Sequence, residues 1–167
     1  MEYHIARVQY FYNKLEYLRK GLYPEFGGNI EFELYTFFEV CYHLKDWIKK
    51  SEGYNEFSNV EQYINNTACL RICADICNRL KHKQLTDRRS NTHIGHFELQ
   101  NSIEVGPNPS DARCTILSAE IDTELGKISC FVLAIECMEA WNNYFIINGK
   151  NSILAIWCSW ILNTALY

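Results

Sequence analysis

The stretch CLRICADICNRLKH, residues 69–82, decides the fold of this chain because its polarity varies with the period of an α-helix. At about 100° per residue, the apolar side chains fall on one side: Ile72, Cys73, Ile76, Cys77 and Leu80. A narrow polar line falls on the other side: Arg71, Asp75, Asn78 and His82. A helix with one apolar side packs that side against other elements, so the stretch predicts a helix within a bundle.

Two longer segments before this stretch have the same period. The first covers residues 3–22, with core positions at Ile5, Val8, Tyr12, Leu15 and Leu22. The second covers residues 29–50, with core positions at Ile30, Leu34, Phe37, Phe38, Cys41, Leu44 and Ile48. Ser58 or Asn59 is expected to cap a short third helix. Asn66 or Thr67 is expected to cap the helix of the opening stretch, which should reach about Lys83.

After this stretch the helical period is lost between Thr86 and Pro109. Apolar residues on alternate positions predict one strand near residues 97–105 and a second at 113–121, which gives a β insertion at about 96–122. Residues 128–147 predict another long helix, with one side formed by Phe131, Ile135, Met138, Trp141 and Phe145. The predicted fold class is therefore mainly α, a single helical domain over residues 1–167 that forms a helical bundle with a small two-stranded β insertion.

The last segment, residues 152–167, is an apolar stretch of about fifteen residues. A membrane-spanning helix needs roughly twenty, so we expect a docked core helix or an oligomer interface here, and no membrane. The first residues contain no apolar signal core, which predicts a cytoplasmic protein.

The composition excludes two broad classes of protein. Hydrophobic residues make up 48% of the chain and aromatic residues 14%, too many for a disordered protein. The net charge of −4 argues against a surface coated in positive charge for general nucleic-acid binding. None of the eight cysteines forms a Cys-x-x-Cys pair, so Cys69, Cys73 and Cys77 are interpreted as core residues and no metal or other cofactor is expected.

A second polar line repeats the first on the helix predicted at residues 29–50. Glu39, His43, Asp46 and Lys50 are spaced four, seven and eleven residues from the first member, as are the members of the line from Arg71 to His82. Each line could be a solvated helix face stabilised by pairs of opposite charge. Alternatively, the two lines face one another across a groove.

The segment from residue 79 to 89 carries a local excess of positive charge against one acid, Asp87: Arg79, Lys81, Lys83, Arg88 and Arg89. Such an excess suits phosphate. Basic residues also favour the C-terminal end of a helix because they complement its dipole, so a purely structural interpretation stays open.

The strings HLKDW, residues 43–47, and DICNRLKH, residues 75–82, resemble the two signature helices of a family of small bacterial proteins. The resemblance covers about half the chain, from the second helix to Leu85. More distantly, the arrangement resembles the HEPN superfamily, whose members are helical bundles of toxins, defence systems and RNA processing.

Many HEPN proteins are metal-independent endoribonucleases that act as dimers, and their hallmark is an arginine four to six residues before a histidine on one helix. Here Arg79 precedes His82 by only three residues. The pairs Arg88–His93 and Arg89–His96 have the right spacing but fall in a predicted loop. The resemblance therefore implies either a ribonuclease or a non-catalytic descendant of one.

The first hypothesis is a non-enzymatic interaction module: a dimerising regulator of a defence or toxin-type system that binds a second copy or a partner protein. The apolar C-terminal segment and the eleven tyrosines favour it. Under this hypothesis the two polar lines form a structural hydrogen-bond network, with Asp46 and His82 as partners.

The alternative is a metal-independent endoribonuclease. His82 would transfer the proton of a ribose 2′-hydroxyl, with His43 as the second proton-transfer group. Arg79 or Arg71 would stabilise the developing phosphate charge, Asn78 would orient the phosphate, and Asp75 would hold the arginine. Asp46 belongs to the same catalytic set, and the remaining basic residues would bind RNA: Arg71, Lys81, Lys83, Arg88 and Arg89.

A third hypothesis is metal-assisted hydrolysis with His43, Asp46, Asp75 and His82 as ligands, since bundle metal sites recruit side chains from facing helices. The spacing lacks the Glu-x-x-His repeat of di-iron bundles.

Overall fold

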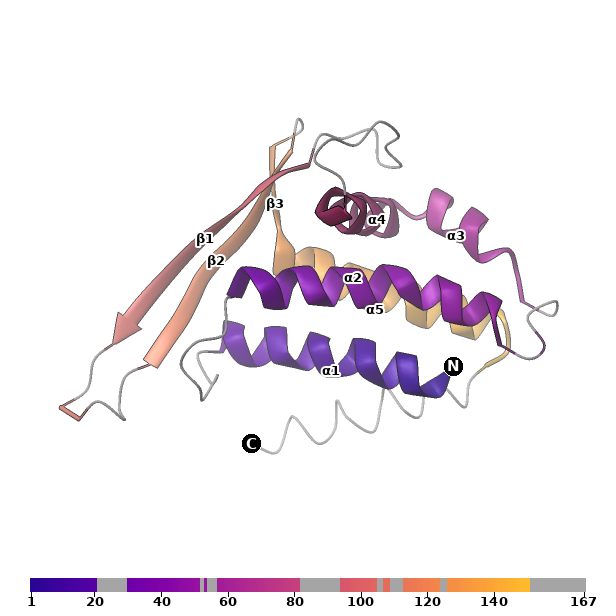
Figure 1. Ribbon diagram of the computed structural model, residues 1–167, viewed down its shortest axis with the longest axis horizontal. Coiled ribbons are helices and arrows are strands. Elements are labelled where there is room, and N and C mark those ends of the chain that lie inside the picture. Colours follow the sequence, from indigo (N-terminus) through magenta and orange to yellow (C-terminus); the bar gives the residue numbers. More distant parts are fainter. Residues whose placement is uncertain are drawn as a thin grey trace.

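Helices form most of the described part of the chain, and a small antiparallel sheet lies at one end of them (Figure 1). The computed structural model describes residues 1–20, 30–51, 53, 57–81, 94–104, 107–108, 113–123 and 126–150. Of these, residues 80–81, 94–97, 101–104, 113–117 and 123 are described by their backbone alone. The helices are α1 (Glu2–Arg19), α2 (Ile30–Lys49), α3 (Val60–Asn66), α4 (Ala68–Lys81) and α5 (Cys130–Ile147). The strands are β1 (Ile94–Glu104), β2 (Arg113–Thr123) and β3 (Gly126–Ser129).

Helix α2 is the centre of the bundle. It runs antiparallel to α1 and lengthwise along α5, whereas α4 crosses it and is seen nearly end-on in Figure 1. Helix α2 contacts α1, α3, α4 and α5. Its core residues Leu34, Phe37 and Phe38 are fully buried, as is Ile48 near its end. The core side predicted for this helix is thereby confirmed.

The short helix α3 begins where the sequence predicts a cap. The Asn59 side chain accepts hydrogen bonds from the backbone N–H groups of Glu61 at 3.0 Å and Gln62 at 3.1 Å. These bonds satisfy amide groups that the first helical turn leaves without partners. Thr67 ends α3, and α4 begins at the next residue.

The β region has one strand more than the sequence predicts. Strands β1 and β2 pair antiparallel over the predicted insertion, with Phe97 opposite Ile121. Strand β3 then pairs with β2 at residues for which the sequence predicts no strand and, from residue 128, the start of a helix. Gly126, the first residue of β3, has φ +111°, a conformation that other residues rarely adopt.

Two side chains lie differently from the predicted helix faces. Asp75, expected on the polar side of its helix, is fully buried in α4. Ile135, expected in the core, is 38% exposed on α5. The helix predicted over residues 152–167 lies outside the described residues. Within the described helices, none combines the length and the apolar character needed to cross a membrane.

Candidate functional site

His43 of α2 lies where this helix crosses α4. Its Nε2 atom is 3.6 Å from the Sγ atom of Cys77 on α4, and its Nδ1 atom is 2.9 Å from Oδ2 of Asp46 one turn further along α2. With Nδ1–H donating to the carboxylate, Nε2 is left to accept from the thiol. Both ring nitrogens therefore contact groups of the protein.

Asp46 connects this histidine to a charged cluster between α2 and α3. Its Oδ1 atom accepts a hydrogen bond from Nζ of Lys45 at 2.7 Å, and the same ammonium lies 3.3 Å from Oε1 of Glu61 on α3. Lys49 also pairs with Glu61. Because Lys45 is only 8% exposed, its charge needs these two acidic partners. We call His43, Lys45, Asp46, Lys49 and Glu61 the α2–α3 network.

The pKa values of this network follow from its contacts. Burial raises the pKa of Asp46, but hydrogen bonds from Lys45 and His43 outweigh it and bring the pKa below its usual value. Burial lowers the pKa of Lys45, and its pairs with Asp46, Tyr42 and Glu61 raise it above the usual value. Both groups are therefore charged at neutral pH, and the network is a set of compensated ion pairs.

The remaining residues of the HLKDW string contact other parts of the bundle. Leu44 is buried in the core. The Trp47 ring stacks on His4 of α1, with the ring centroids 3.5 Å apart and the planes 11° from parallel. Together with the contacts of His43 to α4 and of Lys45 to α3, this single turn and a half of α2 joins three neighbouring helices. Each residue of the HLKDW string therefore makes a packing or polar contact within the bundle.

The polar line predicted on α4 separates into different environments. Nη1 of Arg71 donates to the backbone carbonyl of Asn65 at 2.7 Å, close to the end of α3. Asp75 lies in the interior, whereas Asn78 and Arg79 are half-buried. The Arg79 charge acts on Tyr35 of α2, where it opposes the increase in the tyrosine pKa that burial and Glu31 cause. The two polar lines do not meet as parallel rows, because the helices that carry them cross.

Several predicted site residues are not described by the structure. His82, Lys83, Arg88, Arg89 and His93 lie outside the described residues. Lys81 closes α4 and His96 belongs to β1, but only the backbone of each is described.

Cys77 is the member of this site that the sequence analysis assigned to the core alone. The order Cys77, His43, Asp46 is that of a nucleophile, its base and the carboxylate that orients the base. However, Cys77 is fully buried, and a buried thiol cannot reach a substrate. The contact instead holds α2 against α4. No sequence signal marks it, since it depends on the angle at which the two helices cross.

The metal-ligand set considered from the sequence includes His82, which lies outside the described residues. Among the described residues, the group close enough to share a metal ion is Cys41 of α2, Cys73 of α4 and Cys137 of α5, whose sulfur atoms lie within 4.8 Å of one another. All three are fully buried. His43 and Asp46 contact each other, as the sequence spacing indicates, but no described metal group includes them with Asp75.

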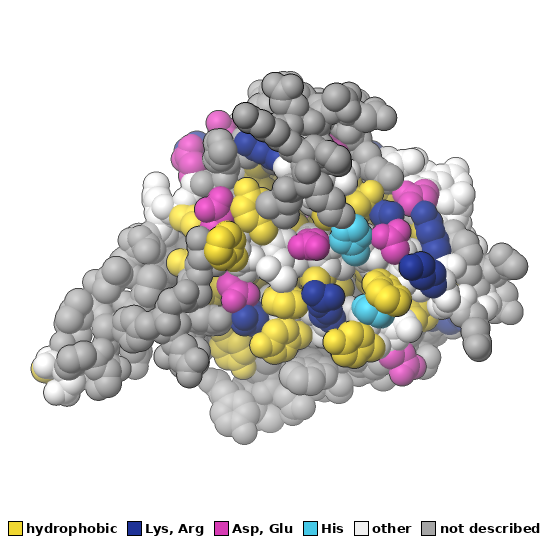
Figure 2. All heavy atoms as spheres, in the orientation of Figure 1, with side chains coloured by type: hydrophobic (Ala, Val, Ile, Leu, Met, Phe, Trp, Pro, Cys, Tyr) yellow, Lys and Arg dark blue, Asp and Glu magenta, His cyan; other side chains and the backbone are white. Residues whose placement is uncertain are grey.

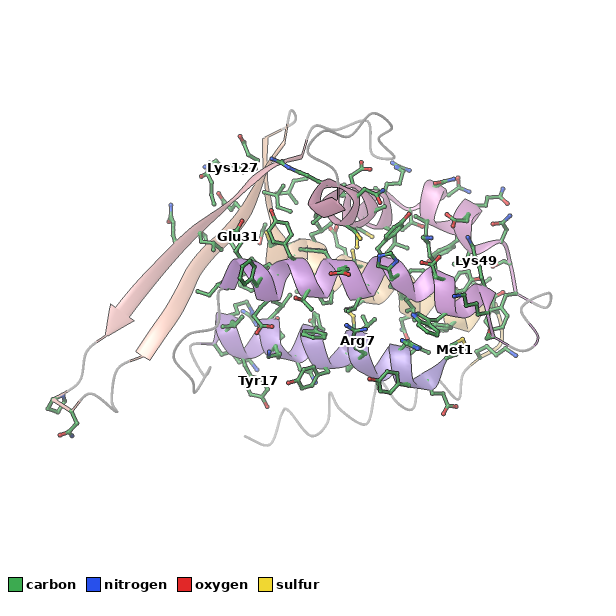
Figure 3. All side chains as sticks on the ribbon, in the orientation of Figure 1. Met1, Arg7, Tyr17, Glu31, Lys49 and Lys127 are labelled. Carbon is green, nitrogen blue, oxygen red and sulfur yellow. The ribbon has the colours of Figure 1, made fainter. Side chains whose placement is uncertain are left out.

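Among the described residues, large apolar side chains lie exposed on α1, α2 and α5. Tyr3, Tyr10 and Tyr17 of α1 are 74%, 56% and 42% exposed. Hydrophobic side chains and basic ones alternate over the face that α1 and α2 form in Figure 2, and Figure 3 shows Tyr17 projecting from α1 on the side away from α2. Helix α5 also exposes apolar side chains, among them Val132 and Ile147.

Comparisons with protein-family models, with curated proteins and with solved structures found no match to this chain.

Proposed function

We propose that this chain is a non-enzymatic interaction module that pairs with a second copy of itself through α1. One observation carries the proposal: the exposed tyrosines Tyr3, Tyr10 and Tyr17 are spaced by seven residues. At about 100° per residue they form one line on the side of α1 opposite to the buried Ile5 and Val8. Apolar side chains that recur every seven residues supply one of the two heptad positions through which paired helices pack along their lengths.

An antiparallel pairing fits this line because it is symmetric about Tyr10. The two-fold axis would pass beside Tyr10, and Tyr3 would meet Tyr17 of the partner subunit, as a self-complementary interface requires. The exposed Glu2 would lie near Lys20 of the partner subunit, so the ends of the two helices would attract each other.

The charges along the other edge of the line are also compatible with this pairing. Lys14 would approach Arg7 of the partner subunit, but Lys14 is already neutralised by Glu33 of its own chain, whose Oε1 atom lies 2.7 Å from Nζ. The same ammonium lies 5.7 Å from the centroid of the Tyr10 ring, where it supports the ring in its exposed position.

The α2–α3 network supports a non-catalytic role. Its charges are compensated within the chain, and the two nitrogens of His43 contact Cys77 and Asp46. A general base must have a nitrogen within hydrogen-bond reach of the proton it takes. The proposal includes the role that the family resemblance implies, regulation in a defence or toxin-type system.

The first prediction is that the wild-type chain sediments as a dimer and that Tyr10→Glu sediments as a monomer. Two glutamates at the two-fold axis would repel each other, and the aromatic contact would be lost. Sedimentation velocity of both proteins over a range of concentrations measures this. Val132→Glu on α5 is the matched control, because Val132 is 52% exposed. A monomeric wild type, or an equal effect of the two variants, would show the proposal to be wrong.

RNA cleavage is the second candidate, and the observation in its favour is the packing of α2 directly against α4. This packing places the helices of the two signature strings side by side, with Asn78 and Arg79 half-buried at the surface of α4. In this candidate His82 transfers the proton, Arg79 binds the phosphate and Asn78 orients it. His43 acts only through the position of α4, because its nitrogens have other partners.

The second prediction separates this candidate from the first. If the chain is a metal-independent ribonuclease, purified protein cleaves total RNA in the presence of EDTA, and both His82→Ala and Arg79→Ala abolish cleavage while remaining folded by circular dichroism. Lys150→Ala, remote from α4 in sequence and placed after α5, serves as the control. Wild-type protein that leaves RNA intact rejects the ribonuclease and leaves the interaction module.

A further inference from the structure

We propose that the buried thiols of Cys41, Cys73 and Cys137, with Cys69 as the fourth ligand, form a structural site for one zinc ion. The first three sulfur atoms come from α2, α4 and α5 and lie within 4.8 Å of one another. Four thiolates around zinc at about 2.3 Å place their sulfur atoms about 3.8 Å apart. Shifts of about an ångström would therefore bring these three sulfur atoms to the spacing of a tetrahedral site.

Cys69 is the candidate for the fourth zinc ligand. It precedes Cys73 by one turn of α4, and residues four apart on a helix lie on the same side. Its thiol interacts with that of Cys137, and the Cys137 thiol donates to the Cys69 carbonyl at 3.6 Å. Cys137 thus lies beside Cys69 as well as within the group of three, and the Cys69 thiol, which is not within 4.8 Å of all three sulfur atoms, would turn toward Cys41 and Cys73 to complete the site.

A second observation distinguishes this cluster from ordinary core cysteines. The Trp141 side chain is fully buried, and its Nε1–H group has no hydrogen-bond partner among the described residues. The indole lies beside the Cys41 sulfur. A buried N–H group without a partner destabilises the fold, and a metal-bound thiolate is an acceptor that would satisfy it. Such N–H···S contacts are the outer-shell partners that metal–thiolate sites use.

The binding step conserves charge and requires no change of oxidation state. Zinc displaces one proton from each of four thiols, and four protons leave to the solvent as four zinc–sulfur bonds form. The two S–H groups that now donate to carbonyls, Cys73 to Phe38 at 3.3 Å and Cys137 to Cys69, lose those weak bonds. Because the thiols are buried, the ion enters as the chain folds, and its binding energy adds to the stability of the junction.

The test uses cobalt as a spectroscopic replacement for zinc. The full-length chain is unfolded with a reductant and refolded with Co²⁺, or with Zn²⁺ for metal analysis. We expect one ion per chain, a thiolate-to-cobalt charge-transfer band and the intense visible bands of tetrahedral cobalt. Cys73→Ser should lose the bands. Cys130→Ser is the matched control, because Cys130 is also fully buried but lies outside the cluster, and it should keep them.

Melting temperatures with and without zinc provide a second test in case a cysteine variant folds poorly. Zinc should raise the melting temperature of the wild type and of Cys130→Ser, and excess EDTA during refolding should remove the increase. Cys41→Ala should melt at the same temperature with and without zinc. Wild-type protein that refolds without taking up cobalt or zinc overturns the proposal, as do cobalt bands of equal intensity in Cys73→Ser and Cys130→Ser.

Discussion

At the scale of single residues, Asp46 shows how one carboxylate links local sequence to tertiary structure. Its spacing of three residues from His43 places both side chains on one side of α2, and the structure joins them at 2.9 Å. Its predicted partner His82 lies outside the described residues. Its second partner, Lys45, connects it to Glu61 of α3. No sequence pattern indicates this link, because Lys45 and Glu61 lie on different helices and meet only through the packing of α3 against α2.

The third prediction concerns the pH dependence that Asp46 produces. Its pKa is lowered in the folded chain, so its contribution to stability is complete above the pKa of the unfolded chain, about 3.9, and is lost as the pH falls through the lower folded value. Since the side chain is 39% exposed, we expect Asp46→Asn to reduce the free energy of unfolding by no more than about 1 kcal/mol at pH 7. Urea denaturation at several pH values measures this.

The difference between wild type and Asp46→Asn should shrink in acid and vanish once the wild-type carboxyl is protonated. Glu39→Gln, an exposed change on the same helix, should leave the stability unchanged across the range. A loss in Asp46→Asn that persists undiminished in acid would contradict the assignment of its stabilising role to charge.

At the scale of the elements, the periodicity of the sequence and its capping residues predict which helices exist and where they begin and end. How deeply a side chain is buried depends on the packing of the elements against one another. The sequence predicts a helix at 29–50 and α2 spans Ile30–Lys49. It does not predict that Asp75 is buried, because the angular position of a residue on a helix does not reveal how many elements cover that side. Strand β3 is missed for a related reason: four residues are too few for a period, and only its pairing with β2 makes it a strand.

The fourth prediction tests the cap of α3. Replacing Asn59 by alanine removes the acceptor for the N–H groups of Glu61 and Gln62, and we expect the free energy of unfolding to fall by about 1 kcal/mol. Asn59→Ser, which keeps an oxygen acceptor, should retain most of the stability. Asn143→Ala, an exposed position inside α5, is the control and should have little effect. Equal stability of Asn59→Ala and wild type in urea would show that the cap bonds contribute nothing.

At the scale of the whole molecule, the HLKDW string of α2, residues 43–47, joins several helices. The turn from His43 to Trp47 contacts α1, α3 and α4, and the thiol cluster lies where α2, α4 and α5 meet. Both features were visible in the sequence only as residue types at helical spacing. What the sequence could not supply is the crossing of α4 over α2, which brings Cys77 to His43 and separates the two polar lines.

If α2 is the centre of the fold, stability should depend on its buried side far more than on its exposed one. Phe37 is fully buried and Phe32 is 67% exposed on the same helix, so the pair allows a matched comparison. We expect Phe37→Ala to cost about 3–5 kcal/mol, a large part of the roughly 5–15 kcal/mol that stabilises a typical domain. Phe32→Ala should remain within about 0.5 kcal/mol of wild type. Urea denaturation measures both, with Phe37→Leu as a milder variant if Phe37→Ala does not fold. Similar losses of unfolding free energy in the two alanine variants would mean that the buried side of α2 does not determine the stability of the fold.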